Sequence, residues 1–193
     1  RRIRQCPARR LLGGDRVRGT RGQNACDQKS GAHASTMPAT AADSHCPPAR
    51  ATAQATAAAV GQATGLAVNT APGWYERRFG AWEGMFFKEI EEQDPDGYAR
   101  WKQDKVGYTP AGGETIHDVL ERIRGELQAL LKAHAGQTIA LVSHVGPIRI
   151  AVADGFQMPI ELYRQIQIDY ASISQINYGE TRNNLIYLNR VGY

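Results

Sequence analysis

The pattern of apolar and polar positions divides the chain near residue 45. Residues 1–44 contain no aromatic side chain. Their large aliphatic side chains are Ile3, Leu11, Leu12, Val17 and Met37. A segment this poor in large side chains buries too little surface to offset the entropy cost of ordering it. We therefore expect residues 1–44 to be weakly ordered and residues 45–193 to form one domain.

Helical spacing of apolar side chains recurs through the domain. Between Val119 and Leu131 they return every three or four positions, which predicts a helix from about residue 115 to 134. Thr115 and Asp118 stand three residues apart, as in a capping box that opens such a helix. Further helices are expected at 47–64, 85–93, 98–105 and 147–156, with a turn at 94–97 between the second and third of these.

Short apolar runs between the helices predict strands. Residues 138–143 form a continuous apolar run, which is typical of a strand buried on both faces. Shorter runs predict strands at 66–69, 171–178 and 185–188. Because these strands alternate with helices, the pattern favours an α/β sandwich.

Net charge is unevenly distributed along the chain. Residues 1–50 hold ten Lys and Arg against three Asp, whereas residues 51–193 hold thirteen against sixteen acidic residues. The basic segment has no aromatic residues among its arginines, so we do not expect a nucleic-acid partner, although a basic binding tail is the alternative from another class. No apolar run reaches the ~18 residues of a membrane span. Three widely spaced cysteines favour a reducing compartment, and we expect a cytoplasmic protein.

His144 is the first candidate for chemistry. It lies between the predicted strand 138–143 and the predicted helix 147–156. Ligands of open α/β sheets bind at the carboxyl ends of strands, where a helix N-terminus presents free N–H groups to an anion. An imidazole there can donate to a phosphoryl oxygen or exchange protons. A purely structural histidine that caps the strand end by a backbone hydrogen bond fits the spacing equally well.

Two glutamates and one arginine are further candidates. Glu76 and Glu83 lie among aromatic residues and glycines, where partial desolvation would suit a carboxyl group to protonate a leaving group. The alternative is that both glutamates pair with Arg77 and Arg78 on a loop surface. Arg50, near the start of a predicted helix, either binds phosphate with its guanidinium group or is a solvated surface residue.

Four segments, in order along residues 46–193, resemble signatures of the histidine phosphatase superfamily, which is also called the phosphoglycerate-mutase-like family. Residues 46–51 resemble S-P-L-x-R-A, and residues 76–84 resemble E-x-x-F-G-x-W-E-G. Residues 110–115, with Asp118 and Arg122 after them, resemble P-x-G-E-S and the following D and R. Ser143-His144 stands where the second catalytic histidine belongs. The resemblance implies a three-layer α/β/α sandwich of the phosphoglycerate mutase-like type, with an atypical N-terminal part.

The same resemblance implies hydrolysis of a small phosphomonoester with no metal and no other cofactor. Arg50, His144 and Val145 would bind the phosphoryl group, and Glu76 would act as the general acid. Glu83 is less suited to that role because it belongs to the W-E-G element. The standard spacings of a zinc site are also missing from the chain's cysteines and N-terminal histidines.

The segment after the second histidine resembles one branch of the family. Val145-Gly146-Pro147-Ile148 is similar to the branch that contains α-ribazole phosphatases and phosphatase domains fused to ribonuclease H. The expected substrate is therefore a small phosphorylated metabolite similar to α-ribazole phosphate, or a sugar or glycerate phosphate. A phosphoglycerate mutase is less favoured, because mutases of this family are usually longer. The sequence leaves both a monomer and a homodimer open.

The family's nucleophile, a histidine in an R-H-G motif, is not found. Residues 9–15 resemble the loop after that motif, which places the motif near residues 1–6, where no histidine stands. His33 and His45 lie elsewhere and lack the flanking Arg and Gly. Three hypotheses follow: a frameshift within residues 1–45, a phosphate-binding pseudoenzyme, or a truncated chain whose first strand lies upstream of Arg1.

Overall fold

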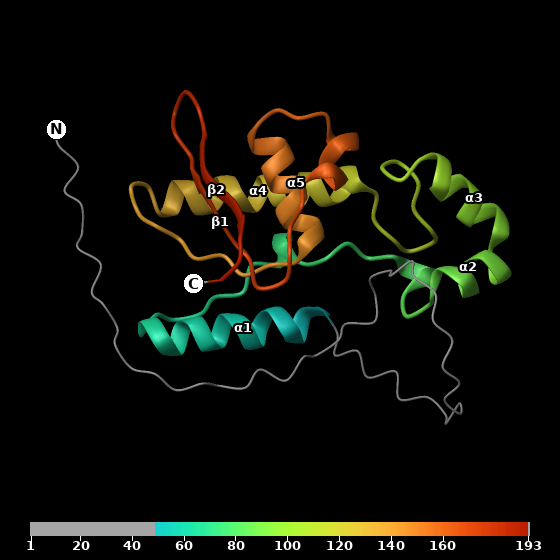
Figure 1. The fold of residues 1–193 in the computed structure, drawn as a ribbon, viewed down its shortest axis with the longest axis horizontal. Helices are drawn as coiled ribbons and strands as arrows, with labels where there is room; N and C mark the ends of the chain where they lie inside the picture. The colour runs from blue at the N-terminus through green and yellow to red at the C-terminus, as the bar shows by residue number, and fades with distance from the viewer. Residues whose placement is uncertain (1–48, 193) are drawn as a thin grey trace. The chain divides into compact units, whose positions relative to one another are not determined.

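The fold is known from a computed structural model that describes residues 49–192. These residues form α-helices, short 3-10 helices (η) and one pair of strands (Figure 1). In chain order the elements are α1 Ala49–Thr64, η1 Pro72–Trp74, η2 Gly80–Trp82, α2 Phe87–Gln93, α3 Pro95–Gln103, α4 Ile116–Ala133, α5 Val145–Gly155, η3 Ile160–Gln165, β1 Ile173–Asn177 and β2 Asn184–Arg190. Within this range no helix has the length and apolar character needed to cross a membrane. The expected weak order of residues 1–44 and the boundary near residue 45 lie outside the described residues.

α4 begins at the capping box predicted from the sequence. The backbone N–H of Asp118 donates to the Thr115 hydroxyl at 3.1 Å, and the backbone N–H of Thr115 donates to the Asp118 carboxylate at 2.7 Å. The hydrogen bonds from Thr115 also hold the pKa of Asp118 below its usual value. Two backbone donors without helical partners are thereby satisfied, which fixes where the helix begins.

The expected turn at 94–97 is instead the start of α3. Asp94 is the N-cap of this helix, and its carboxylate accepts from the Gly97 N–H at 3.0 Å. Pro95 follows at the first helical position, where the absent N–H costs nothing. Asp and Pro are common both in turns and at the start of helices, and here they begin a helix.

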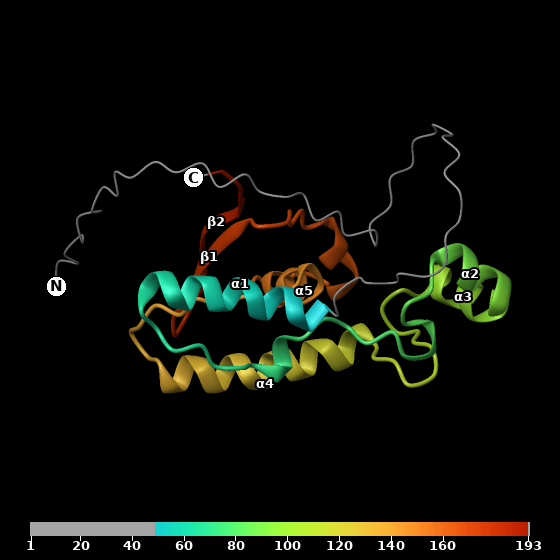
Figure 2. The same cartoon turned by 90° about the horizontal axis from the view of Figure 1, so that it is seen from below.

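The main core lies between α4, α5, η1 and η3. Its central side chains come from α4 and α5, which Figures 1 and 2 show next to each other, and Ile176 and Leu188 of the β1–β2 hairpin pack against it. The buried members are Trp74, Ile116, Val119, Leu120, Ile123, Ile150, Ala151, Val152, Ala153, Tyr163, Ile166 and Ile168. Burial of α4 and α5 in this core fixes the N-terminus of α5 relative to the chain near Trp74.

Replacing Ile123 with alanine is expected to lower the free energy of unfolding by about 2–5 kcal/mol. Ile123 is fully buried in the main core, so the substitution removes apolar contacts and leaves a cavity. Urea denaturation followed by circular dichroism measures the change. Gln128, exposed on the same helix, supplies the control Gln128→Ala, which should stay within about 0.5 kcal/mol of the unchanged chain. Equal effects of the two substitutions would contradict the position of this core.

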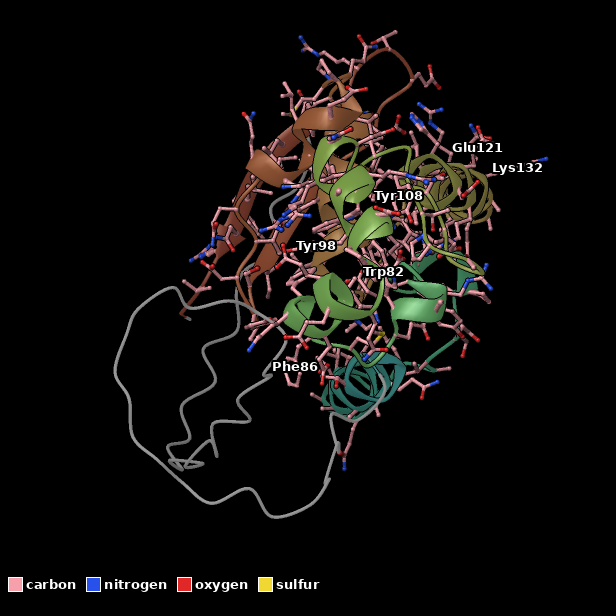
Figure 3. The ribbon with its side chains drawn as sticks, turned by 90° about the vertical axis from the view of Figure 1, so that its right-hand side faces the viewer. Trp82, Phe86, Tyr98, Tyr108, Glu121 and Lys132 are labelled. Atoms are coloured by element: carbon pink, nitrogen blue, oxygen red, sulfur yellow. The ribbon has the colours of Figure 1, made fainter. Side chains whose placement is uncertain are left out.

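Side chains of α2, α3 and the chain next to them form a second, smaller core, which we call the aromatic cluster. Trp82 and Trp101 pack edge to face with ring centroids 6.3 Å apart, and Trp101 stacks on Tyr98 at 5.8 Å. Figure 3 shows Trp82, Tyr98 and Tyr108 in this part of the molecule. Its buried members are Trp82, Ile90 and Trp101, and those packed against them are Phe79, Met85, Phe87, Tyr98 and Tyr108.

Two of the four predicted strands are formed, and two are not. β1 and β2 pair antiparallel, with Gln175 opposite Tyr187, and they agree with the runs at 171–178 and 185–188. Residues 66–69 and 138–143 form no strand, which corrects the sequence prediction. Leu66 is 67% exposed and Ile139 is 40% exposed. A strand buried on both faces needs hydrogen-bonded neighbours, and among the described residues β1 and β2 pair only with each other.

Candidate active site

His144 is the N-cap of α5. Its backbone is extended, with φ −109° and ψ 164°, and its carbonyl accepts the first helical hydrogen bond, from the Ile148 N–H at 3.1 Å. The imidazole is half-buried and takes no part in capping the helix. Because an α-helix has no internal acceptor for its first N–H groups, the N–H groups at this end of α5 can bind an anion. This end of α5 therefore joins an imidazole to a partly positive helix terminus.

Glu76 lies against the same helix terminus. One carboxylate oxygen accepts from the Arg77 N–H at 2.9 Å, and the other accepts from the Gly146 N–H at 3.4 Å. Nearby, the Ser143 hydroxyl donates to the carbonyl of Trp74 at 2.7 Å. Two segments about seventy residues apart in the sequence are thus joined on either side of His144. The sequence-predicted acid and imidazole therefore come from segments that the fold brings together.

The chain around Glu76 is held from α4 by a partly buried ion pair. Arg122 forms a two-pronged contact with the Glu114 carboxylate, at 3.0 and 3.1 Å. The same guanidinium donates to the carbonyls of Gly73 at 2.6 Å and Glu76 at 3.3 Å. One turn further along α4, Glu126 accepts from the Gly73 N–H. Arg122 therefore links α4 to both ends of the segment 73–76.

Arg77 is the second arginine of the site, and it is buried. Only 8% of its surface is exposed, and its guanidinium donates to the carbonyls of Glu114, Lys105 and Tyr108 at 2.6, 3.2 and 2.8 Å. Burial lowers the pKa of Arg77. Burial alone would raise the pKa of Glu114, but hydrogen bonds from Arg122 and from the Arg78 N–H outweigh that effect and lower it. The Glu114 carboxylate is therefore held in its charged form at neutral pH.

The alternative pairing of the two glutamates with Arg77 and Arg78 is not observed. Arg77 donates to backbone carbonyls, and Arg78 lies 3.6 Å from Glu114. Glu83 is exposed, and its carboxylate accepts from the Phe79 N–H at 3.2 Å, which stabilises a local turn. Arg50 is the second residue of α1, and its side chain lies outside what the structure describes.

Two surface hollows of about 470 Å³ each lie outside these residues. One is near the start of α4, around Lys105 and His117, and the other is near the β1–β2 turn, around Arg182. Neither is lined by His144 or Glu76. Within residues 49–192 no three His, Cys, Asp or Glu side chains are grouped so as to hold a metal ion.

The buried Arg77 and Glu114 and the partly buried Arg122 are the part of the site that residue patterns did not assign. Their side-chain hydrogen bonds to the backbone join positions 28 to 49 residues apart, and because most of the acceptors are backbone carbonyls, no sequence motif marks them. The available signal was the resemblance of residues 110–122 to a family signature, which marks Glu114 and Arg122 without giving them a role.

A comparison with protein families matches residues 33–191 to the histidine phosphatase superfamily, branch 1. Among curated proteins, a bifunctional protein of Mycobacterium tuberculosis is 35% identical over 119 residues, which cover 61% of this chain and 32% of that protein. Phosphoserine phosphatase 1 of Hydrogenobacter thermophilus is 32% identical over 110 residues, which cover 57% of this chain and 52% of that protein. The chain therefore spans a third to a half of the length of these relatives.

A solved structure shows the same relationship. The α-ribazole phosphatase of Shigella flexneri matches with a TM-score of 0.67 and 28% identity, over 72% of this chain and 68% of that one. The matched protein has the expected fold class. It is also an α-ribazole phosphatase, and residues 145–148 of this chain resemble the signature of the branch that contains those enzymes. The α/β/α type expected from the sequence is thus confirmed at the level of the fold, although the strands expected at 66–69 and 138–143 are not formed.

Proposed function

Because the chain belongs to the histidine phosphatase superfamily, branch 1, we propose that it is a phosphomonoester hydrolase acting on a small phosphorylated metabolite. The observation that carries this proposal is the contact between the Glu76 carboxylate and the N-terminus of α5, the helix that His144 begins. In the cleavage of a phosphate ester, an acid can protonate the leaving oxygen while an anion-binding helix terminus stabilises the charge on the phosphoryl group.

The roles follow from the chemistry of each group. The N–H group of Val145 and the imidazole of His144 would donate to the phosphoryl oxygens. Arg50 would add a guanidinium group, which matches phosphate geometry. As a water molecule attacks phosphorus and the ester P–O bond breaks, Glu76 in its protonated form would give its proton to the leaving oxygen, so that the products are the alcohol and inorganic phosphate. The named phosphatases among the relatives support a substrate of the phosphoserine or α-ribazole phosphate kind.

A second candidate function is binding of phosphorylated ligands without turnover. The observation that favours it is the absence of an R-H-G motif from the 193 residues. Without a histidine to accept the phosphoryl group, the same groups would still bind phosphate through hydrogen bonds and charge. For either function we also propose the cytoplasmic location expected from the cysteine pattern.

Replacing His144 with alanine is expected to lower turnover of 4-nitrophenyl phosphate about 10²–10³-fold, because a donor to the phosphoryl oxygens is removed. Spectrophotometry measures turnover, and isothermal titration calorimetry with inorganic phosphate measures binding in the same samples. His134, exposed at the end of α4, supplies the control His134→Ala, which should change neither quantity. Phosphate binding without turnover favours the second candidate. A chain that neither binds phosphate nor hydrolyses the ester contradicts both.

A further inference from the structure

The position of the Glu76 carboxylate depends on few contacts. It accepts from the N–H of its own neighbour, Arg77, and from the N–H of Gly146 at 3.4 Å. The second contact is at the long end of the hydrogen-bond range, where a displacement of a few tenths of an ångström breaks it. Something other than these two contacts must therefore keep the backbone at Glu76 close to α5.

The Glu114–Arg122 pair supplies that support on the other side of Glu76. Arg122 donates to the Glu76 carbonyl at 3.3 Å and to the Gly73 carbonyl at 2.6 Å. Glu114 accepts from the Arg78 N–H at 3.0 Å, and its own N–H donates to the Arg78 carbonyl at 2.9 Å. The backbone is thus tied to one ion pair both before and after Glu76.

The pair itself is held rigidly. Arg122 lies on α4, whose neighbouring residues Val119 and Ile123 are buried in the main core. The carbonyl of Glu114 accepts from the buried Arg77 guanidinium at 2.6 Å. A planar guanidinium that contacts both oxygens of a carboxylate has one favourable orientation. Its remaining N–H groups are therefore aimed at the carbonyls of residues 73 and 76.

We propose that Glu114 and Arg122 are positioning residues that set the distance between the Glu76 carboxylate and the N-terminus of α5. The inference rests on the proposed role of Glu76 as the general acid. Neither residue touches the substrate, and their effect reaches the reaction through the backbone of residues 73–78. A misplacement of about 1 Å in such a site costs about 10²-fold in rate.

The test follows the Gly146 amide by NMR in the full chain as the pH is changed. In the unaltered protein the ¹H and ¹⁵N shifts of Gly146 should follow the titration of a carboxyl group, and Glu76→Gln should abolish this response. Arg122→Lys and Glu114→Gln preserve side-chain size but remove the two-pronged contact. Each is expected to abolish the Gly146 response and to lower kcat about 10²-fold with an unchanged KM.

Arg124 supplies the matched control. It lies on the same helix and forms an exposed ion pair with Asp154 at 2.6 Å, so Arg124→Lys should leave the Gly146 response and kcat unchanged. A full Gly146 response in both Arg122→Lys and Glu114→Gln overturns the proposal, and so does global unfolding of both variants, which would make the pair a structural requirement only. The amide titration needs no turnover. A chain that hydrolyses nothing would count against the proposed hydrolase while leaving this test decisive.

Discussion

Replacing Glu76 with glutamine is expected to lower kcat for an alkyl phosphate about 10²–10⁴-fold, which is the usual contribution of a general acid. An alkoxide is a poor leaving group and needs a proton as the P–O bond breaks. A glutamine amide keeps the shape of the side chain but cannot donate an acidic proton. With 4-nitrophenyl phosphate the loss should be much smaller, since nitrophenolate leaves without protonation. Steady-state kinetics on the two substrates measures the difference.

Glu83 is the matched control for that substitution. It lies in the same stretch of sequence, is exposed, and accepts only a local hydrogen bond from the Phe79 N–H. Glu83→Gln is therefore expected to leave the ratio of the two rates unchanged. An equal loss on both substrates in Glu76→Gln would show that this carboxylate does not protonate the leaving group.

Replacing Arg77 with methionine is expected to lower the free energy of unfolding by about 3–5 kcal/mol, because three hydrogen bonds from a charged donor to backbone carbonyls are lost. Methionine preserves much of the side-chain volume but donates no hydrogen bond. The carbonyls of Glu114, Lys105 and Tyr108 would remain without the donors that Arg77 supplies, and each buried acceptor left in this way carries a penalty. Urea denaturation followed by circular dichroism measures the loss.

The adjacent Arg78 separates the effect of burial from that of charge. Its side chain is 68% exposed and lies 3.6 Å from the Glu114 carboxylate. Exposed pairs of this kind contribute about 0–1 kcal/mol, so Arg78→Met should change stability little. A loss of similar size in the two variants would mean that the hydrogen bonds of Arg77 are not the source of the stabilisation.

Local signals in the sequence were sufficient for most helices. The capping residues Thr115 and Asp118 and the apolar spacing after them place α4 within a residue of its observed start. α5 begins at Val145, two residues before the predicted start. Pro147 suggested the later start, but a proline is tolerated within the first turn because the first N–H groups of a helix have no internal partner.

The strand predicted at 138–143, which the structure does not form, shows where local signals stop being sufficient. A continuous apolar run indicates that its side chains favour burial, but a strand is buried only when other strands pair with it on both sides. Whether such strands are present depends on the whole fold and not on the run itself. The β1 and β2 strands could be predicted because the two runs lie close together in the sequence and pair with each other.

The candidate site divides in the same way. His144 and Glu76 could be selected from the sequence because each stands beside a recognisable pattern. Arg77 could not be given its role, because its guanidinium contacts carbonyls contributed by three separate positions, which exist as a group only in the folded chain. A backbone carbonyl can accept a hydrogen bond whatever side chain its residue carries, so these contacts cannot be predicted from a pattern of residue types.

The separation of the aromatic cluster from the main core determines what tryptophan emission reports. Of the three tryptophans in the chain, Trp82 and Trp101 contact each other in the aromatic cluster, whereas Trp74 belongs to the main core. Two of the three tryptophans therefore report on the smaller core and one on the main core. Helical ellipticity at 222 nm is instead dominated by α1, α4 and α5, the longest helices described. Melting curves recorded with the two probes follow different parts of the same chain, and their coincidence measures whether the two cores unfold as one cooperative unit.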